Sequence, residues 1–582
     1  FEGEIPPQYL LNIWGMIGIA VLFSLPIFSF FRLYSFSWAY VSTQELISLI
    51  KGTFVAFSLI TVAFFLLRDQ SVFHGFPRST LLISYIFIFI FAGASRFAKR
   101  LYLQIFSSRS SERERTLIVG AGLAGEQILR SIQASRESNY NPIGFVDDDG
   151  QKQGILIHGI KVLGRIGDIP RVVKEEDAEG LIIALSSAGS RVIRQAVELG
   201  RQAKLKKIKI IPSLGEIING QISTGLLREV EMEDLLGRDP VSLDKTGLTD
   251  FLEGKKVLIT GAAGSIGSEL SRQVAKFEPL SLLLLDQDET GIFNISEELK
   301  DRFPKLDVQS RVCDILDEKK IGKIFSEFSP GVVFHAAAYK HVPLMEENSD
   351  EAAKNNILGT ETLVRASLAN GTEKFIFIST DKAVNPSSVM GATKRAGEMI
   401  CQFYNKPENV TKFISVRFGN VLNSRGSVIP IFREQIKRGG PVEITHPEMK
   451  RYFMVTSEAC LLVMQAGAMG QGGEVFVLDM GEAVKIVDLA KEMIRLSGLE
   501  PDKDIPIVFT GIRPGEKLAE EIFNRKEEML STSNQKIFIA KLLPFPEEFF
   551  RKELEVLKEV VYKGNKETVI GALKSLIPEF KH

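Results

Sequence analysis

Three apolar runs dominate the first hundred residues. Residues 9–31 are 23 consecutive uncharged positions, mostly apolar, enough helix to cross a hydrocarbon core of about 30 Å. Residues 52–67 and 79–95 are shorter uncharged runs, bordered by Lys51, Arg68 and Arg78, whose side chains can extend to a membrane interface. A single short run would also fit a buried helix, but three so close together favour membrane spans. The pattern predicts about three transmembrane helices in residues 1–100, in contact with membrane lipid.

Basic residues follow the third run and predict its orientation. They are Arg96, Lys99, Arg100, Arg109, Arg113 and Arg115. By the positive-inside tendency the chain after them is cytoplasmic, and three spans would place residue 1 on the other side. Because the sequence opens with Phe1, an earlier span or a cleaved signal peptide are both compatible with it.

A first α/β pattern covers residues 112–215. An apolar strand at 116–119 leads into Gly120, Gly122 and Gly125 and a helical pattern, and Asp147 closes the next apolar run. This order fits a phosphate at the helix amino end and a ribose-binding acid, but such turns also serve packing alone. Both interpretations stay open. Residues 216–253 carry charges and no long apolar run, which predicts a linker with short helices.

A sharper α/β pattern extends from residue 254 to 582. A strand at 256–260 is followed by Gly261, Gly264 and Gly267, a helix at 268–277, and a strand ending at Asp286, 19 residues past Gly267. The glycines allow a tight turn, approach of the backbone to pyrophosphate, and helix packing, in that order. Asp286 can bind ribose hydroxyls and repels a 2′-phosphate. The pattern therefore predicts an NAD site, not an NADP site.

Further polar residues follow later strands. Asp314 is suitably placed for an adenine amino group, and small alanines at 336–338 allow close approach of a cofactor, ahead of the donors Lys340 and His341. An ordinary loop histidine is the alternative for His341. Because the carboxyl ends of parallel strands meet at one edge of a sheet, we expect these residues in one cleft.

Thr380, Asp381 and Lys382 follow the apolar strand 374–378. A hydroxyl, a carboxyl and an amine at a strand end supply a proton donor, a base and an orienting group. A surface Asp-Lys pair is the alternative.

The composition narrows the class of function and the possible ligands. The 582 residues have 25% charged side chains and a formal net charge of -1, which argues against nucleic acid as a partner. Cys313, Cys401 and Cys460 fit neither a disulfide framework nor a zinc site, so we expect a reducing compartment and no metal.

Four motifs resemble those of the extended short-chain dehydrogenase/reductase family. They are Thr-Gly-Ala-Ala-Gly-Ser-Ile-Gly at 260–267, His-Ala-Ala-Ala-Tyr-Lys-His-Val-Pro at 335–343, Ser-Thr-Asp-Lys at 379–382 and Arg-Phe-Gly-Asn at 417–420. Within it the whole chain resembles the membrane-bound nucleoside-diphosphate-sugar 4,6-dehydratases, above all those acting on UDP-N-acetylglucosamine in bacterial protein N-glycosylation.

The resemblance implies a multi-pass protein of the bacterial inner membrane with cytoplasmic catalytic domains. Its fold would be α/β: transmembrane helices, a small Rossmann-like domain, and a dehydratase Rossmann domain with a substrate-binding part mainly in 417–582. A homo-oligomer is compatible with it. The implied reaction is NAD-mediated dehydration of UDP-N-acetylglucosamine to a 4-keto-6-deoxy sugar with retained configuration at C5. Alternatives are an inverting 4,6-dehydratase, a UDP-sugar 4-epimerase, a membrane sugar-1-phosphate transferase and a nonenzymatic NAD sensor.

The resemblance also implies site residues. The cofactor would contact Gly261, Ala263, Gly264, Ser265, Ile266, Gly267, Asp286, Asp288, Asp314, Ile315, Ala336, Ala337, Ala338, Lys340, Asn355 and Lys394. The substrate would contact Lys340, His341, Asn420, Val421, Arg425, Ser427, Val428, Pro430, Thr445, Arg451, Arg513 and Glu516. Arginine suits a diphosphate, although a surface salt bridge is the alternative for each one.

In the implied mechanism hydride leaves C4 for NAD and returns to C6. Asp381 would protonate the departing C6 hydroxyl, and Thr380 would bond the C4 oxygen. Lys382 would remove the C5 proton as a neutral amine, which requires a depressed pKa near the nicotinamide cation. The roles of Asp381 and Lys382 could be exchanged, and Thr380, Asp381 or water could accept the C4 hydroxyl proton. One departure from the wider family is Met390, which stands four residues before Lys394 in place of the usual tyrosine base.

Overall fold

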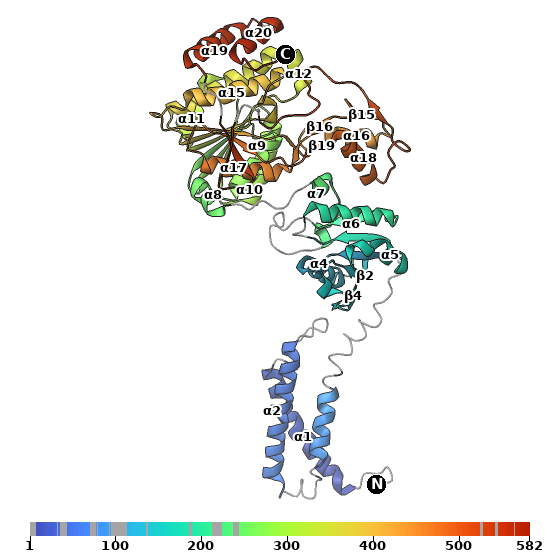
Figure 1. Ribbon diagram of the computed structural model, residues 1–582. Helices are drawn as coiled ribbons and strands as arrows, with labels where there is room; N and C mark the ends of the chain where they lie inside the picture. The colour runs from blue at the N-terminus through green and yellow to red at the C-terminus, as the bar shows by residue number, and fades with distance from the viewer. Residues whose placement is uncertain are drawn as a thin grey trace. The chain divides into compact units, whose positions relative to one another are not determined.

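The computed structural model describes most of the chain. The described residues are 7–31, 33–34, 43–69, 77, 79–91, 94, 113–135, 138–185, 189–211, 224–236, 244–523, 528–541, 545–563 and 565–582. They form two compact units, Phe1–Arg113 and Glu114–His582 (Figure 1). Of the basic residues that predict orientation, Arg96, Lys99, Arg100 and Arg109 lie outside the described residues.

The first unit consists of apolar helices. Helices α1 (Pro7–Phe30) and α2 (Thr43–Leu67) contain stretches long and apolar enough to cross a membrane, Asn12–Phe30 and Ile47–Leu67. The third predicted span is a shorter apolar helix in its described part, Ser79–Phe91, so two helices meet the length criterion where three were expected.

A seven-stranded sheet begins the second unit. Its order is β3-β4-β2-β1-β5-β6-β7, with strands β3 (Leu156–Ile157), β4 (Ile160–Gly164), β2 (Tyr140–Val146), β1 (Glu114–Val119), β5 (Gly180–Ile183), β6 (Lys207–Ile210) and β7 (Arg228–Glu229). The strands from β4 to β6 run parallel because helices α4 (Leu123–Ala134), α5 (Ile169–Glu175) and α6 (Ser190–Gln202) connect them.

The segment predicted as a linker is shared between the two sheets. Strand β7 pairs antiparallel with β6 at the edge of the seven-stranded sheet. Helix α8 (Lys245–Leu252) instead buries Leu248 and Leu252 in the core beneath the second sheet. Strand pairing by β7 and apolar burial by α8 thus join the described parts of this segment to folded domains.

A nine-stranded sheet is the centre of the larger domain. Its order is β10-β9-β8-β11-β12-β13-β18-β22-β21, with β10 (Asp307–Val312), β9 (Ser281–Asp286), β8 (Lys256–Thr260), β11 (Val332–His335), β12 (Lys374–Ile378), β13 (Lys412–Arg417), β18 (Val475–Leu478), β22 (Ile537–Lys541) and β21 (Glu528–Ser531). The strands are parallel from β10 to β18, and β22 and β21 are antiparallel. The predicted α/β Rossmann class is confirmed. Strand order reverses next to β8, where ligands bind in such sheets.

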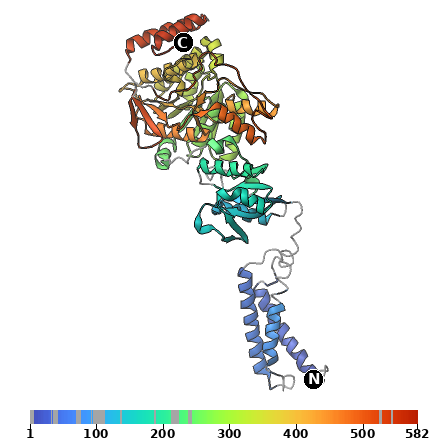
Figure 2. The same cartoon turned by 45° about the vertical axis from the view of Figure 1, so that its right-hand side comes forward.

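Helices cover both faces of this sheet. Along β8, Val257 and Ile259 face one core with α9 (Ser265–Ala275), α10 (Glu289–Arg302) and α17 (Thr456–Met469), while Leu258 faces the other. The second core holds α11 (Glu318–Phe328), α14 (Gly359–Ala369) and α15 (Val389–Tyr404). The last helices, α19 (Glu547–Val561) and α20 (Lys566–Leu576), pack outside this layer (Figure 2).

Short elements after β13 form a lobe beside the carboxyl ends of the strands. Its sheets pair β14 (Asn420–Val421) with β17 (Phe453–Met454), β15 (Val442–Ile444) with β20 (Ile507–Phe509), and β16 (Lys450–Arg451) with β19 (Val484–Lys485). Helices α16 (Val428–Lys437) and α18 (Ile486–Leu496) complete it. From β21 onward the chain returns to the main sheet.

Candidate active site

The glycine turn between β8 and α9 leaves no room for side chains. Gly261 has φ +68°, and a Cβ there would lie 2.5 Å from Ala337 N. A Cβ on Gly267 would lie 2.0 Å from Gly261 O, so the helix packs directly on the turn. Gly264 begins α9, whose amino end favours an anionic group. The turn therefore fits a pyrophosphate.

A small cavity of about 140 Å³ lies beside this turn. Asp286, Asp314, Ile315, Ala337 and Asn355, all predicted cofactor residues, line it. Asp286 Oδ2 accepts a hydrogen bond from Ala263 N over 3.0 Å, which fixes the carboxylate at the end of β9. A carboxylate here accepts bonds from ribose hydroxyls and repels a 2′-phosphate, so the cavity fits NAD.

A cavity of about 630 Å³ adjoins the small one and shares Gly261, Gly264, Ala336, Ala338 and Tyr339 with it. The remaining predicted cofactor residues on its wall are Ser265, Ile266, Gly267, Lys340 and Lys394. The predicted substrate residues on its wall are Lys340, His341, Asn420, Val421, Arg425, Ser427, Val428, Thr445, Arg451, Arg513 and Glu516. One continuous hollow thus joins the predicted cofactor and substrate sites.

Three of the predicted cofactor and substrate residues, Pro430, Ala263 and Asp288, line neither cavity. Pro430 does not line either cavity, because two residues on from Val428 a helical side chain points to another face. The Ala263 Cβ lies 2.5 Å from where a Cβ on Gly291 would be, so it packs against α10. Asp288 caps α10 by accepting from Gly291 N and pairs with Arg425 at 3.4 Å.

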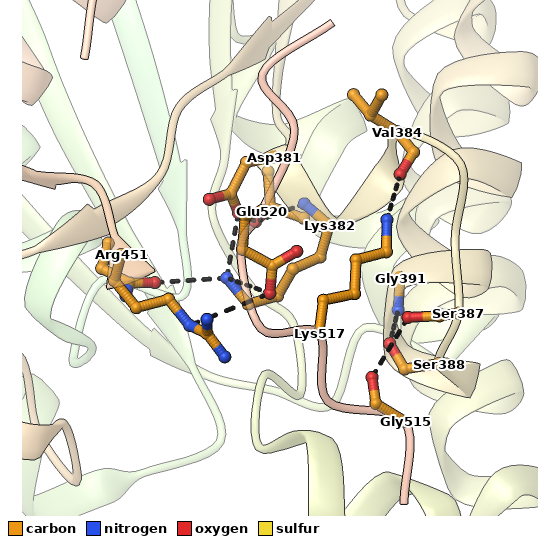
Figure 3. A network of polar contacts seen from close by, with 12 residues as sticks. Asp381, Lys382, Val384, Ser387, Ser388, Gly391, Arg451, Gly515, Lys517 and Glu520 are labelled. Atoms are coloured by element: carbon orange, nitrogen blue, oxygen red, sulfur yellow. Dashed lines mark hydrogen bonds and ion pairs between the residues drawn. The ribbon is translucent and has the colours of Figure 1, made fainter. Parts of the chain in front are cut away.

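The predicted proton-transfer residues meet at the carboxyl end of β12 (Figure 3). Lys382 Nζ donates hydrogen bonds to Asp381 Oδ1 (2.9 Å) and Asn420 Oδ1 (3.2 Å), and Thr380 Oγ1 also donates to Asp381 Oδ1 (2.9 Å). Thr380 and Lys382 line the large cavity, whereas Asp381, 1% exposed, lies behind them. Among the described residues none bonds Asp381 Oδ2.

The protonation of Lys382 in the protein without ligands follows from its neighbours. Burial alone would lower the pKa of this amine, but the carboxylates of Asp381 and Glu520 outweigh it and raise the pKa above its usual value. Without ligands Lys382 is therefore an ammonium paired with Asp381, and the depressed pKa expected beside a bound nicotinamide cation stays a prediction.

Helix α15 presents Met390 and Lys394 to the same cavity, one turn apart. The Lys394 ammonium lies 4.1 Å from the centre of the Phe377 ring. Burial in this apolar setting lowers the pKa of Lys394 to about 7. A thioether exchanges no protons, so Met390 contributes shape only.

A buried ion cluster supports the strand end from behind. Glu398 accepts from Arg417 Nε and Ser379 Oγ over 2.7 and 2.6 Å, and Arg395 pairs with it at 3.0 Å. Burial alone would raise the pKa of Glu398, but its arginine partners lower it to about 2. Ser379 directly precedes Thr380, so the cluster fixes the backbone that carries the three predicted proton-transfer residues.

Sequence reasoning missed Glu520. Its carboxylate lines the cavity, 3.8 Å from Lys382 Nζ and 4.0 Å from Arg451 Nε. It belongs to none of the recognised motifs and sits in no helix or strand, so no periodicity marks it. Only the tertiary return of residues 513–521 to the end of β12 brings it into the site.

The glycine turn of the first α/β domain has the same geometry as the dinucleotide turn. A Cβ on Gly125 would lie 2.0 Å from Gly120 O, as a Cβ on Gly267 would from Gly261 O. Asp147 accepts from Ala121 N (2.7 Å) and Asp149 N (2.9 Å), as Asp286 does from the corresponding amides, and Lys152 Nζ lies 3.1 Å from Asp147 Oδ2. Both interpretations left open by the sequence therefore remain predictions.

The fold and the site define a class: an α/β protein whose glycine turn fits a dinucleotide and whose neighbouring cavity carries acid-base groups. A family model described as polysaccharide biosynthesis protein matches residues 257–542, and a model described as CoA-binding domain matches residues 29–212. The capsular polysaccharide biosynthesis protein CapD of Staphylococcus aureus is 42% identical over 95% of this chain and 91% of its own length. The chain belongs to this polysaccharide biosynthesis protein family.

Two further similarities cover about half of the chain. The inverting UDP-N-acetylglucosamine 4,6-dehydratase of Campylobacter jejuni is 32% identical over 48% of this chain and 81% of its own length. The solved dTDP-glucose 4,6-dehydratase DesIV of Streptomyces venezuelae, with NAD bound, is 20% identical, with a TM-score of 0.41 over 46% of this chain and 88% of DesIV.

Proposed function

We propose that the protein is a membrane-anchored, NAD-dependent UDP-N-acetylglucosamine 4,6-dehydratase that retains configuration at C5 and supplies a 4-keto-6-deoxy sugar for bacterial polysaccharide synthesis. The observation that carries the proposal is the hydrogen-bonded pair of Lys382 and Asp381 beside a cavity that adjoins a dinucleotide turn. The dehydratase relative, 32% identical, supports the substrate class.

The pair matches the proton requirements of dehydration. Elimination removes a proton from C5 and adds one to the hydroxyl that leaves C6 as water. A neutral Lys382 amine and a protonated Asp381 would meet both needs and end as the ammonium-carboxylate pair found in the unliganded structure. The Lys382 ammonium would return its proton to C5 and become an amine again, and Asp381 would be protonated again by the proton that the C4 hydroxyl loses, relayed through Thr380 over 2.9 Å. Positive charge on a bound nicotinamide ring would favour the neutral amine of Lys382 at the start of the reaction.

Thr380 is the proposed link between Asp381 and the sugar. Asp381 lies behind the cavity wall, whereas the Thr380 hydroxyl lines the cavity and bonds Asp381 Oδ1. A protonated Asp381 could donate to Thr380 Oγ1 while the hydroxyl donates to the sugar oxygen. Proton transfer through one intervening hydroxyl is sufficient for general acid catalysis.

Retention at C5 follows from a single base on one face of the sugar. If Lys382 removes the C5 proton and the same ammonium returns it, the proton arrives on the face that it left. Inversion would need a second acid on the opposite face. When bound, NAD supplies a hydride acceptor for C4 and a hydride donor for C6, so no external reductant is needed.

The far end of the cavity suits a uridine diphosphate. Arg451 and Arg513, which line the cavity, would bind the two phosphates, Glu516 the uridine ribose, and the wall from Val428 to Thr445 the base. Helices α1 and α2 would hold the enzyme in the bacterial inner membrane with its catalytic domains in the cytoplasm.

The direct test is turnover of the purified full-length protein. UDP-N-acetylglucosamine without added reductant should give the 4-keto-6-deoxy nucleotide sugar, detected by NMR. Conversion to UDP-N-acetylgalactosamine would indicate a 4-epimerase, and release of UMP a sugar-1-phosphate transferase. Either product in place of the keto sugar would refute the proposal.

A further inference from the structure

Glu520 is an almost fully buried acid at the wall of the substrate cavity. It lies near Lys382 and Arg451, the two cations on which the proposed function depends. Its side chain is 4% exposed, and Oε1 lies 3.8 Å from Lys382 Nζ and 4.0 Å from Arg451 Nε. Figure 3 shows the carboxylate between these two side chains. Both separations are ion pairs longer than hydrogen bonds, so the interaction is mainly Coulombic.

Hydrogen bonds join the segment that carries Glu520 to the loop after Lys382 and to the strand that carries Arg451. Lys517 Nζ donates to Val384 O (3.0 Å) and Asn385 O (2.8 Å), in the loop that follows Lys382. Lys450 N donates to Leu518 O over 2.9 Å, which joins the segment to strand β16 and thus to Arg451. Glu520 therefore keeps its place relative to the proton-transfer pair and to the arginine.

The charges around Lys382 come from three parts of the chain. Asp381 belongs to its own turn, Glu520 to the C-terminal segment, and Arg451 to β16; Asn420 from β14 is a neutral partner. The four charged groups are two cations and two anions in a buried place. A change at any one of them acts on the others because water screens them poorly.

We infer that Glu520 is a positioning residue whose carboxylate couples Lys382, at the reacting end of the cavity, to Arg451, at the diphosphate end. The inference rests on the proposed function, since it takes Lys382 as the base and Arg451 as a phosphate ligand. It adds a residue to which neither the motifs nor the comparisons assign a role.

Removing the charge of Glu520 should change the pKa of Lys382 and the binding of UDP beside Arg451, each in a defined direction. The Glu520 carboxylate raises the pKa of Lys382, so removing its charge lowers that pKa. Because the base acts as a neutral amine, the rising limb of the kcat-pH profile then moves to lower pH. At the other end, loss of the anion beside Arg451 removes repulsion toward an incoming diphosphate, so UDP binds more tightly.

The experiment compares Glu520→Gln with Glu521→Gln in the full-length, NAD-bound protein. Glu521 is the adjacent, exposed acid, which makes it a matched control. We expect Glu520→Gln to shift the rising limb of kcat downward by about one pH unit and to tighten UDP binding about threefold by calorimetry, with Glu521→Gln like wild type. Glu520→Asp, which keeps the charge on a shorter side chain, should be intermediate in both.

Two outcomes would overturn the inference. One is a Glu520→Gln profile that coincides with wild type or with Glu521→Gln; the other is a shifted profile with unchanged or weaker UDP binding, since the two ends would then be independent. A variant that retains NAD is taken as folded. If Glu520→Gln loses its NAD, Glu520→Asp is compared with wild type and Glu521→Gln in its place. If wild type turns over no UDP-N-acetylglucosamine, the proposed function fails, whereas this inference fails only by the differences among variants.

Discussion

Lys382 Nζ donates a hydrogen bond to the Oδ1 atom of its chain neighbour Asp381 over 2.9 Å, while only the lysine touches the cavity. Neighbouring side chains of a strand point to opposite sides, so such a pair meets only where the strand has ended. Here the turn Asp381–Ala383 follows β12 directly. The relationship places a buried carboxylate behind an amine that lines the cavity.

Replacing the amine should abolish the reaction without releasing the cofactor. Lys382→Ala removes the proposed C5 base, so we expect kcat to fall by about 10²- to 10⁴-fold while the purified protein keeps its NAD. Lys541→Ala, an exposed lysine of β22, should behave as wild type. Activity of Lys382→Ala close to that of Lys541→Ala would remove Lys382 from the mechanism.

The hydroxyl of Thr380 should matter more than its methyl group. Thr380→Val keeps the shape and loses the link from Asp381 to the cavity, so we expect kcat to fall at least about 100-fold. Thr380→Ser keeps the hydroxyl and should stay within about tenfold of wild type. Equal activities of the two variants, measured by formation of the keto sugar, would argue against the link.

The thioether of Met390 should be chemically dispensable. Met390→Leu keeps the volume of a buried side chain and removes no proton-transfer group, so kcat should stay within about threefold of wild type. A loss as large as that of Lys382→Ala would show that this position takes part in the chemistry.

The buried cluster behind the strand predicts a large stability effect. Glu398→Gln removes the carboxylate that pairs with the buried arginines Arg417 and Arg395 and should cost about 3 kcal/mol of unfolding free energy. The pKa of Glu398 is lowered from its ordinary 4.5 to about 2 in the folded protein, so its contribution is complete above pH 4.5 and declines as the pH falls toward 2.

Thermal unfolding of wild type and Glu398→Gln, followed by NAD release and circular dichroism at pH 7 and pH 4, measures that contribution. The difference between the two proteins should be smaller at pH 4. A Glu398→Gln variant as stable as wild type at pH 7 would contradict the role given to the cluster.

Much of the fold could be predicted because its signals are local. The buried parallel strands β8, β9 and β12 are continuous apolar runs, and the turn at Gly261 demands a residue that tolerates positive φ. These requirements act within a few residues, so the sequence displays them. The third apolar run stays a prediction as a membrane span, because its described part, Ser79–Phe91, is shorter than a span requires.

What the sequence could not supply depends on distant segments. The place of Glu520 beside Lys382, and its share in the raised pKa of that lysine, result from residues 516–521 packing against the loop that follows β12. Strands β21 and β22 likewise rejoin the main sheet from the end of the chain. No short-range pattern marks such returns.

The most direct test of the account is the fate of the C5 hydrogen. The purified protein is incubated with UDP-N-acetylglucosamine in deuterated water without reductant, and the product is analysed by NMR. If Lys382 removes and returns a proton that exchanges with solvent, the 4-keto-6-deoxy product carries deuterium at C5 with retained configuration. A keto product with hydrogen at C5, or with inverted configuration, would contradict a single exchangeable base on one face of the sugar.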